Sequence, residues 1–283
     1  MYLHGLGQSM KKVISFSLWG NNAFYVVGAL VNADIAKEQW EGWTCRFYVS
    51  DTVPKEAIDD LKQRDNVEVV EMNRDESWNG MFWRFYPASD SDVDVAIFRD
   101  ADSRLNIRDK AAVEEWLQSD KGVHIMRDNC QHGWTICGGM WGTKKGALTN
   151  LKELIEKNEL KETNNKHGID QIFLQYEIYG NVVRDAFVHD DWFPDGFPSE
   201  QKHPFPIPRL RGDGWWEQEF PEWHSGIEDD KEQFQWADSG RDTCFFKCPA
   251  CGEYHDNDYI GKTQIPYGEE KIKYAHIIEA CLA

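Results

Sequence analysis

Apolar segments of strand length alternate with segments of helical periodicity over residues 12–190, and this alternation constrains the fold more than any other feature. Such alternation is typical of parallel sheets, because each crossover between parallel strands carries a helix across one face. The sequence therefore predicts an α/β fold with a mostly parallel central sheet flanked by helices. The expected strands are residues 12–18, 44–49, 67–72, 93–98, 122–126 and 182–188, and the expected helices are residues 23–39, 54–64, 78–87, 107–118 and 168–179.

The C-terminal third differs in composition. Residues 192–240 are rich in Pro, Trp, Gly and acidic residues and have little periodicity, whereas residues 269–281 form an amphipathic segment. We therefore expect one α/β domain over residues 11–192 and an irregular Trp- and Pro-rich extension over residues 193–283.

Charge and aromatic content exclude two classes of protein. The 283 residues include 31 Lys and Arg against 49 Asp and Glu, a formal net charge of −18, which argues against a nucleic-acid binder. The 13 Trp, 10 Tyr and 15 Phe are too many for a disordered chain. These aromatic residues suit either core and interface packing or a surface that stacks on sugar rings.

The first residues and the cysteines indicate the cellular compartment of the protein. No charged segment followed by an apolar one opens the chain, and no stretch approaches the roughly 20 apolar residues of a membrane helix. The 7 cysteines are an odd number, which favours thiols in a reducing compartment or a metal site. We therefore expect a cytoplasmic protein with no membrane span.

The segment VDVAIFRDADSRL carries the clearest chemical signal. An apolar strand delivers Asp100 and Asp102 into a turn at its carboxyl end, which is where ligands bind in parallel sheets. Two carboxylates in one turn can share a hard cation such as Mg²⁺ or Mn²⁺, which in turn binds a diphosphate. The alternative is an Asp-rich turn in which Asp102 or Ser103 caps the following helix.

This DxD arrangement resembles that of GT-A-fold, nucleotide-sugar-dependent glycosyltransferases, including those of large algal viruses and the glycogenin-like retaining galactosyltransferases. The resemblance covers residues 11–192 and implies a Rossmann-like fold. It also implies that Asp100 and Asp102 hold Mn²⁺ or Mg²⁺ against the donor diphosphate. His189, at the end of the last expected strand, corresponds to the histidine that completes the metal site in this family, although a lone histidine after a strand is more often structural.

Further segments match the same family. Arg84, within Phe82–Phe85, resembles the arginine that reaches the donor, or it forms a surface ion pair. Asp170 and Gln171 resemble an Asp-Gln pair beside the donor sugar, or Asp170 stabilises the first turn of a helix. Gly138 and Gly139 resemble the glycine-rich wall of the donor and acceptor pocket, or they form a buried turn.

Other donor contacts are placed by topology. Trp19 and Asp51 follow the first two strands, where the nucleotide would lie. Arg127 and Asp128 follow the fifth strand, where the family often contacts the donor sugar and where a surface salt bridge is an equally good interpretation. The sequence departs from the glycogenin-like pattern after His189, because it lacks the glycine-rich Lys-Pro-Trp ending.

The resemblance implies transfer of a hexosyl or pentosyl group from a nucleotide-diphosphate sugar to a glycan or other hydroxyl acceptor. Retention of configuration is favoured, with Asp170 or Gln171 stabilising the cationic sugar. If configuration inverts, Asp170 or Asp191 is the candidate base.

A cysteine cluster lies in the extension. Cys244, Cys248, Cys251 and His255 have the ligand spacing of a structural zinc site, and the alternative is a set of free thiols in a small core.

Two other functions remain open from sequence. A haloacid-dehalogenase-like phosphatase would use Asp100 as its nucleophile. A non-catalytic carbohydrate-binding protein would use the Trp-rich residues 192–240 and would not need Asp100, Asp102 and His189.

Overall fold

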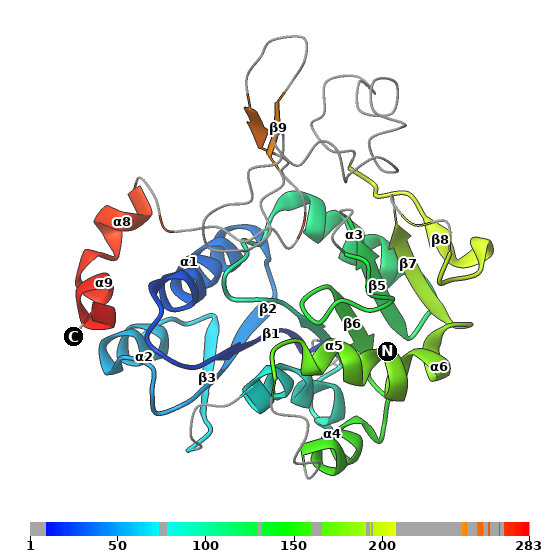
Figure 1. Cartoon of the computed structure of the whole chain (residues 1–283), viewed down its shortest axis with the longest axis horizontal. Helices are drawn as coiled ribbons and strands as arrows, with labels where there is room; N and C mark the ends of the chain where they lie inside the picture. Colours follow the sequence, from blue (N-terminus) through cyan, green and yellow to red (C-terminus); the bar gives the residue numbers. More distant parts are fainter. Residues whose placement is uncertain are drawn as a thin grey trace, which may run out of the picture.

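The protein is built around an eight-stranded sheet in the order β3-β2-β1-β4-β6-β5-β7-β8 (Figure 1). A computed structural model describes residues 10–73, 78–128, 132–159, 166–190, 193, 195–207, 260, 266 and 269–282, and the backbone of 245–247 and 254–256. The strands of this sheet are β1 (Lys12–Leu18), β2 (Trp43–Val49), β3 (Val67–Glu71), β4 (Val95–Phe98), β5 (Val123–Arg127), β6 (Trp141–Lys144), β7 (Ala186–Asp190) and β8 (Lys202–His203). A separate antiparallel pair consists of β9 (Phe245–Lys247) and β10 (Tyr254–Asp256).

The expected helical segments are confirmed, and the structure adds α4 and η4, which the sequence did not predict. The flanking helices are α1 (Ala23–Gln39), α2 (Lys55–Lys62), the 3₁₀ segment η1 (Trp78–Ser89), α3 (Ile107–Gln118), α4 (Leu151–Glu159), α5 (Ile169–Phe173), the π-helical segment η3 (Leu174–Ile178), α6 (Tyr179–Val182), the short 3₁₀ turn η4 (Ser199–Gln201), α8 (Glu269–Lys273) and α9 (Ala275–Leu282). Asparagines begin two of the helices: Asn22 Oδ1 accepts from the Phe24 amide at 3.0 Å, and Asn106 Oδ1 accepts from the Asp109 amide at 2.9 Å.

The sheet is mostly parallel, which confirms the predicted fold class. β1 pairs in parallel with β2 and β4, and β7 pairs in parallel with β5 and β8. The exception is β6, which runs antiparallel between β4 and β5. The sequence did not predict β6, because four residues that include Gly142 carry no alternation of polar and apolar side chains.

The last large strand also differs from its expected bounds. A strand was expected from residue 182, but α6 extends to Val182 and β7 begins at Ala186. Val182 is buried as a helix residue, so its apolar character does not distinguish helix from strand.

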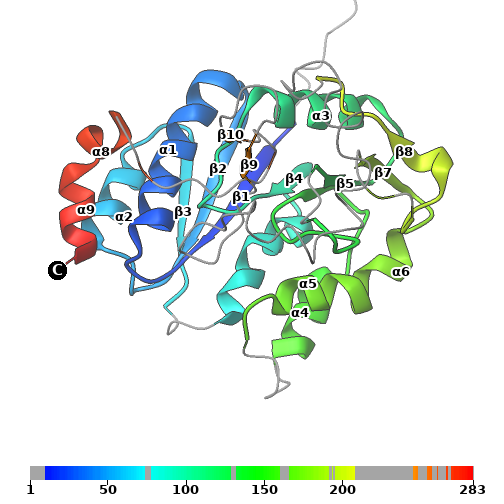
Figure 2. The same ribbon diagram turned by 45° about the horizontal axis from the view of Figure 1, so that its top comes forward.

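Alternate strand residues face two different cores. On one face, Ile14 and Phe16 of β1 pack with residues of α1, α2 and α3. On the other face, Val13 packs with residues of η1, α4 and α5. Figure 2 shows these two sets of helices on opposite sides of the sheet, so the molecule has three layers.

Described residues after 192 join the same body at several points. β8 adds to the edge of the sheet beside β7, and α8 and α9 pack against α1 and α2 (Figure 1). Ile277 and Cys281 of α9 are buried in the core that α1 and β1 share. Segments from both sides of residue 192 therefore pack together. None of the described helices has the length and apolar character needed to cross a membrane.

Candidate active site

A buried arginine joins two carboxylates at the carboxyl edge of the sheet. Arg84 lies in η1 and donates to Asp100, which follows β4. Its Nη2 also donates to Oδ2 of Asp170, in the first turn of α5, at 2.5 Å. Its own amide donates to Ser17 Oγ at 3.0 Å, which fixes η1 against β1. Three segments that are far apart in the sequence thus present one cluster of charges.

The glycine-rich segment before β6 packs directly against this cluster. A Cβ atom added to Gly138 would lie under 3.0 Å from the Asp170 carboxylate and the Arg84 guanidinium. A Cβ atom added to Gly139 would lie under 3.0 Å from the Asp100 carboxylate. Only glycine allows the backbone to approach both carboxylates so closely.

The turn that carries Asp100 and Asp102 is fastened to α1 by Asn32. Asn32 Nδ2 donates to the Ser103 carbonyl at 2.7 Å, and its Oδ1 accepts from the Leu105 amide at 2.9 Å. Ser103 Oγ in turn donates to the Asp100 carbonyl at 2.9 Å. These hydrogen bonds fix the backbone conformation of the turn after β4. Asn32 was missed from the sequence, although a buried asparagine in an otherwise apolar stretch of helix is a signal for such a contact.

Burial and mutual charge set the protonation of the cluster. Burial raises the pKa of Asp170 above its ordinary value, with the Arg84 charge opposing that shift and the Asp100 charge adding to it. Burial alone would lower the pKa of Arg84, but the two carboxylates outweigh it and raise that pKa. The guanidinium is therefore charged at any working pH, and it is the cation that holds Asp170 in place.

Two atoms of the cluster have no hydrogen-bond partner within the described structure. Asp170 Oδ1 and Arg84 Nε are both buried and unpartnered. Asp100, by contrast, is half exposed, with 41% of its side chain accessible. An exposed carboxylate beside buried, unpartnered polar atoms is the arrangement expected where a polar ligand binds.

His189 does not join Asp100 and Asp102. Its Nδ1 shares a hydrogen bond with His124 Nε2 at 2.8 Å, and its Nε2 lies 3.2 Å from Glu115 Oε2. Among the described residues no group of three or more His, Cys, Asp or Glu side chains is arranged to hold a metal ion. The three-residue metal site expected from the sequence is therefore corrected, because both nitrogens of His189 are engaged by side chains of α3 and β5.

Two carboxylates nevertheless suit a magnesium-like ion. Such an ion keeps several waters and commonly takes one or two protein carboxylates together with phosphate oxygens of the substrate. Asp100, which is half exposed, and Asp102 of the same turn, which is 8% exposed, carry carboxylates of that kind. The residues present therefore fit a divalent ion that binds with its substrate.

Arg127 and Asp128 form buried ion pairs, whereas the alternative that the sequence left open was a salt bridge on the surface. Arg127 pairs with Asp190 and donates to the Asp195 carbonyl at 2.7 Å. Asp128 pairs with Arg108 and accepts from the Ile260 amide at 2.9 Å. These contacts fasten the chain after β7 to the sheet.

The other expected donor residues lie nearer the solvent. Trp19 is half buried after β1, where its ring meets Trp78 and Trp83 edge-on with centroids 6.5 Å and 6.4 Å apart. Asp51 is exposed after β2, and Gln171 is half buried beside Asp170. Their contacts with a donor stay predictions.

Some predictions fall outside the described residues. These are the candidate base Asp191 and the zinc ligands Cys244, Cys248 and Cys251. Of His255 only the backbone is described, in β10. The zinc site therefore stays a prediction.

Solved structures with a similar arrangement of elements include glycosyltransferases. A glycosyltransferase involved in glycosylation of the major capsid of PBCV-1 is 13% identical, with a TM-score of 0.44, over 64% of this chain and 81% of that one. The mannosyltransferase PcManGT from Pyrobaculum calidifontis, in complex with GDP-Man and Mn²⁺, is 13% identical, with a TM-score of 0.42, over 73% of this chain and 59% of that one.

The similarity is not confined to glycosyltransferases. A 4-diphosphocytidyl-2C-methyl-D-erythritol synthase from Anaerococcus prevotii is 10% identical, with a TM-score of 0.42, over 66% of this chain and 91% of that one. No protein-family model and no curated protein sequence matches the chain. At such identities and TM-scores, the activity has to be argued from the side chains of this protein.

Proposed function

We propose that the protein is a glycosyltransferase that moves a hexosyl or pentosyl group from a nucleotide-diphosphate sugar to a hydroxyl of a glycan or other acceptor. The observation that carries this proposal is the cluster at the carboxyl edge, in which Arg84 joins Asp100 to Asp170 and Gly138 and Gly139 lie against both carboxylates.

A divalent ion, Mn²⁺ or Mg²⁺, would be held by Asp100 and Asp102 together with the donor diphosphate. It would offset the negative charge that develops on the leaving nucleotide diphosphate. This requirement follows from the charges of the cluster, since one arginine and two carboxylates leave it net negative, unfavourable for an anionic donor.

Asp170 and Gln171 would act on the sugar. When the bond from the anomeric carbon to the diphosphate breaks, that carbon gains cationic character. The acceptor oxygen attacks it, and the hydroxyl proton passes to the oxygen of the leaving diphosphate. A buried carboxylate with one unpartnered oxygen is well suited to stabilise this cation. Arg84 opposes the rise in the pKa of Asp170 and orients its carboxylate, and retention of configuration is the outcome we favour.

The glycines and the strand ends would position the donor. Gly138 and Gly139 permit the backbone to approach the sugar and the diphosphate, and Trp19 and Asp51 would contact the nucleotide. If configuration inverts instead, Asp191 is the alternative base.

A thermal-shift screen tests the proposal. We expect one of UDP-, GDP-, CMP- or dTDP-sugars to raise the melting temperature, and the shift to depend on Mn²⁺. Asp100→Asn should abolish the Mn²⁺-dependent shift. The matched control is Asp92→Asn, because the Asp92 side chain is 64% exposed and lies outside the cluster. Full donor binding and transfer by Asp100→Asn would overturn the proposal.

A further inference from the structure

The C-terminal helices reach the turn that carries the two candidate metal-binding carboxylates. α8 and α9 lie beside α1 and α2, as Figure 1 shows, although more than 160 residues separate Arg104 from Glu270 in the sequence. The described polar contacts of these helices fall into two groups, one around Asp34 of α1 and the end of α2, and one at the turn after β4.

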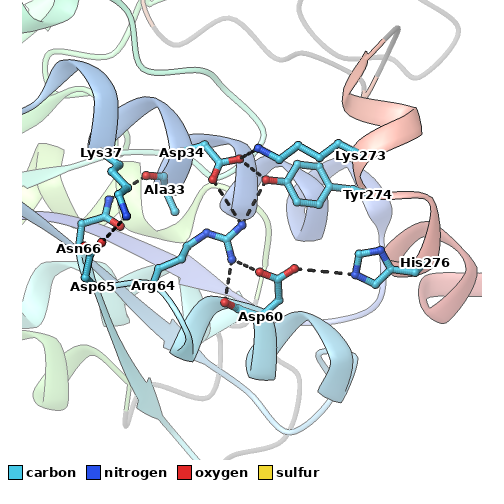
Figure 3. Close-up of polar contacts among 10 residues, drawn as sticks. All are labelled: Ala33, Asp34, Lys37, Asp60, Arg64, Asp65, Asn66, Lys273, Tyr274 and His276. Carbon is cyan, nitrogen blue, oxygen red and sulfur yellow. Dashed lines mark hydrogen bonds and ion pairs between the residues drawn. The ribbon is translucent and has the colours of Figure 1, made fainter.

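The first group is a polar network around Asp34 of α1 (Figure 3). Asp34 accepts hydrogen bonds from Tyr274 and, at 2.6 Å, from Lys273 Nζ. Arg64 donates to Tyr274 Oη at 3.2 Å and pairs with Asp60, and Asp60 lies 3.8 Å from His276 Nε2. The network therefore ties the junction of α8 and α9 to α1 and to the end of α2.

Burial of apolar side chains supports the same docking. Tyr274 is 2% exposed, and Ile277 and Cys281 are buried in the core that contains α1. Burial together with the Asp34 carboxylate raises the pKa of Tyr274, so its hydroxyl remains a hydrogen-bond donor. The helices are thus a fixed part of this layer.

The second group is an ion pair between α8 and the turn after β4. Arg104 Nε and Nη2 donate to Glu270 Oε1 and Oε2 at 3.3 Å and 3.1 Å, and Arg104 Nη1 donates to the Ser103 carbonyl at 3.3 Å. The guanidinium is packed against α1, where a Cβ atom on Gly28 would lie under 3.0 Å from it. Two parallel hydrogen bonds fix the orientation of an arginine better than one does.

The turn is therefore held from two directions. Asn32 holds the backbone of Ser103 and Leu105 from α1, and Glu270 holds Arg104 from α8. We propose that Arg104 and Glu270 are positioning residues, and that α8 fixes the turn so that Asp100 and Asp102 meet a divalent ion and its diphosphate in one geometry. The mechanistic part of this inference rests on the proposed function.

Hydrogen exchange of the metal-free protein tests the positioning without any assay of activity. In Glu270→Ala, the amides of Ser103 and Leu105, which donate to the Asp100 carbonyl and Asn32 Oδ1, should exchange about tenfold faster. The amides of β1 and β2 should keep their rates. Glu269→Ala is the matched control, because Glu269 is exposed on the same helix.

Arg104→Lys gives an independent test, because it keeps the charge and loses the paired hydrogen bonds. It should accelerate the same two amides by less than Glu270→Ala does. Unchanged exchange at Ser103 and Leu105 in both variants, or equal acceleration throughout the chain, would overturn the proposal.

Activity supplies a second readout. Glu270→Ala should need about tenfold more Mn²⁺ for half-maximal transfer and keep its kcat at saturating Mn²⁺. A lowered kcat with an unchanged Mn²⁺ requirement would contradict the positioning. If the unmodified protein transfers no sugar from any donor, the proposed function fails, and the exchange experiment still decides whether Glu270 positions the turn.

Discussion

Two clusters of charged residues at the carboxyl edge of the sheet differ in how their arginines pair with carboxylates. In the Arg84 cluster, one arginine serves both Asp100 and Asp170, and an oxygen of Asp170 has no partner among the described residues. Beside β5 and β7, each arginine has its own carboxylate, in the pairs Arg127–Asp190 and Arg108–Asp128, although Arg127 Nε, like Arg84 Nε, has no hydrogen-bond partner among the described residues.

The surroundings of the two clusters differ as well. The guanidinium groups near β5 are covered by aromatic rings, with Arg108 4.0 Å from the centroid of Phe205 and Arg127 4.6 Å from that of Phe193. Asp100 is half exposed instead. The comparison suggests that the paired charges stabilise the fold, whereas the shared charges are available to a ligand. Substitutions in the two clusters should therefore affect different properties.

The largest expected effect is on stability, at Asp128. Asp128→Asn removes the carboxylate charge that pairs with the buried Arg108, which should lower the free energy of unfolding by about 3–5 kcal/mol. Urea unfolding measures this loss. The control is Asp185→Asn, because 73% of that side chain is exposed and its pair with Lys121 should contribute about 0–1 kcal/mol. Equal stability of the two variants would contradict the structural part of the comparison.

At Arg84 the effect should be on activity. Arg84→Lys cannot bind Asp100 and Asp170 together in the same geometry, so transfer should fall by about 10²–10³-fold, as for loss of a preorganised charge contact.

Arg46→Lys is the matched control for this change. Arg46 also joins two carboxylates, Glu68 and Asp90, but it belongs to β2. It should keep its kcat while its urea midpoint falls. An equal loss of kcat in both variants would show that position in the fold does not decide the effect.

The stability of the protein should depend on pH through the buried His189, which lies in β7, beside β5. Burial lowers the pKa of His189 to about 4, with Glu115 opposing the shift. An unfolded histidine titrates near 6.5, so between these values the unfolded chain binds a proton that the folded chain does not. Stability contributed by neutral His189 is therefore present above about pH 6.5 and lost as the pH falls toward 4, by up to about 3 kcal/mol.

His189→Gln should lose less stability between about pH 7 and pH 4 than the unmodified chain does, as measured by urea unfolding at each pH. A residual slope should remain from His124, whose pKa burial also lowers. His276→Gln is the control, because 61% of that side chain is exposed. The charged and titratable groups that face His189 are Glu115, His124, His203 and Arg108. An unchanged slope in His189→Gln would assign the acid sensitivity to other groups.

The smallest expected effect is steric. Gly138→Ala places a methyl group against Asp170 and Arg84, and the displacement should cost about 1–3 kcal/mol of transition-state stabilisation, or roughly 5–150-fold in transfer. Gly180→Ala is the control, because nothing lies within 4 Å of its added Cβ and it lies in α6. Wild-type transfer by Gly138→Ala would remove the glycine segment from the site.

Much of the site was accessible from sequence. Arg84, Gly138 and Gly139 were expected to contact the donor, Asp100 to hold the metal ion and Asp170 to act on the sugar. The structure gathers these five residues into one cluster. Asp100 follows a strand and Asp170 lies in the first turn of a helix, where the local pattern fixes the position, whereas Arg84 and the two glycines were expected from their resemblance to family motifs.

The residues that the sequence placed wrongly or missed have side-chain partners that are distant in the sequence. His189 also ends a strand, yet it faces His124 and Glu115, which no local pattern relates to it. Asn32 and Glu270 were missed for the same reason, since their partners are far away in the sequence. Periodicity tells which residues are buried, and it does not tell which buried polar groups meet.

The sequence by itself determined the α/β alternation, the parallel character of the sheet and the edge at which polar residues gather, because these depend on periodicity and on short-range turn chemistry. Only the tertiary structure decided that β6 lies antiparallel between β4 and β5, that Arg84 is shared while Arg127 is paired, and that α8 reaches the turn after β4. Those features depend on long-range pairing of charges and hydrogen bonds, which the packing of the layers selects from many partners of equal local suitability.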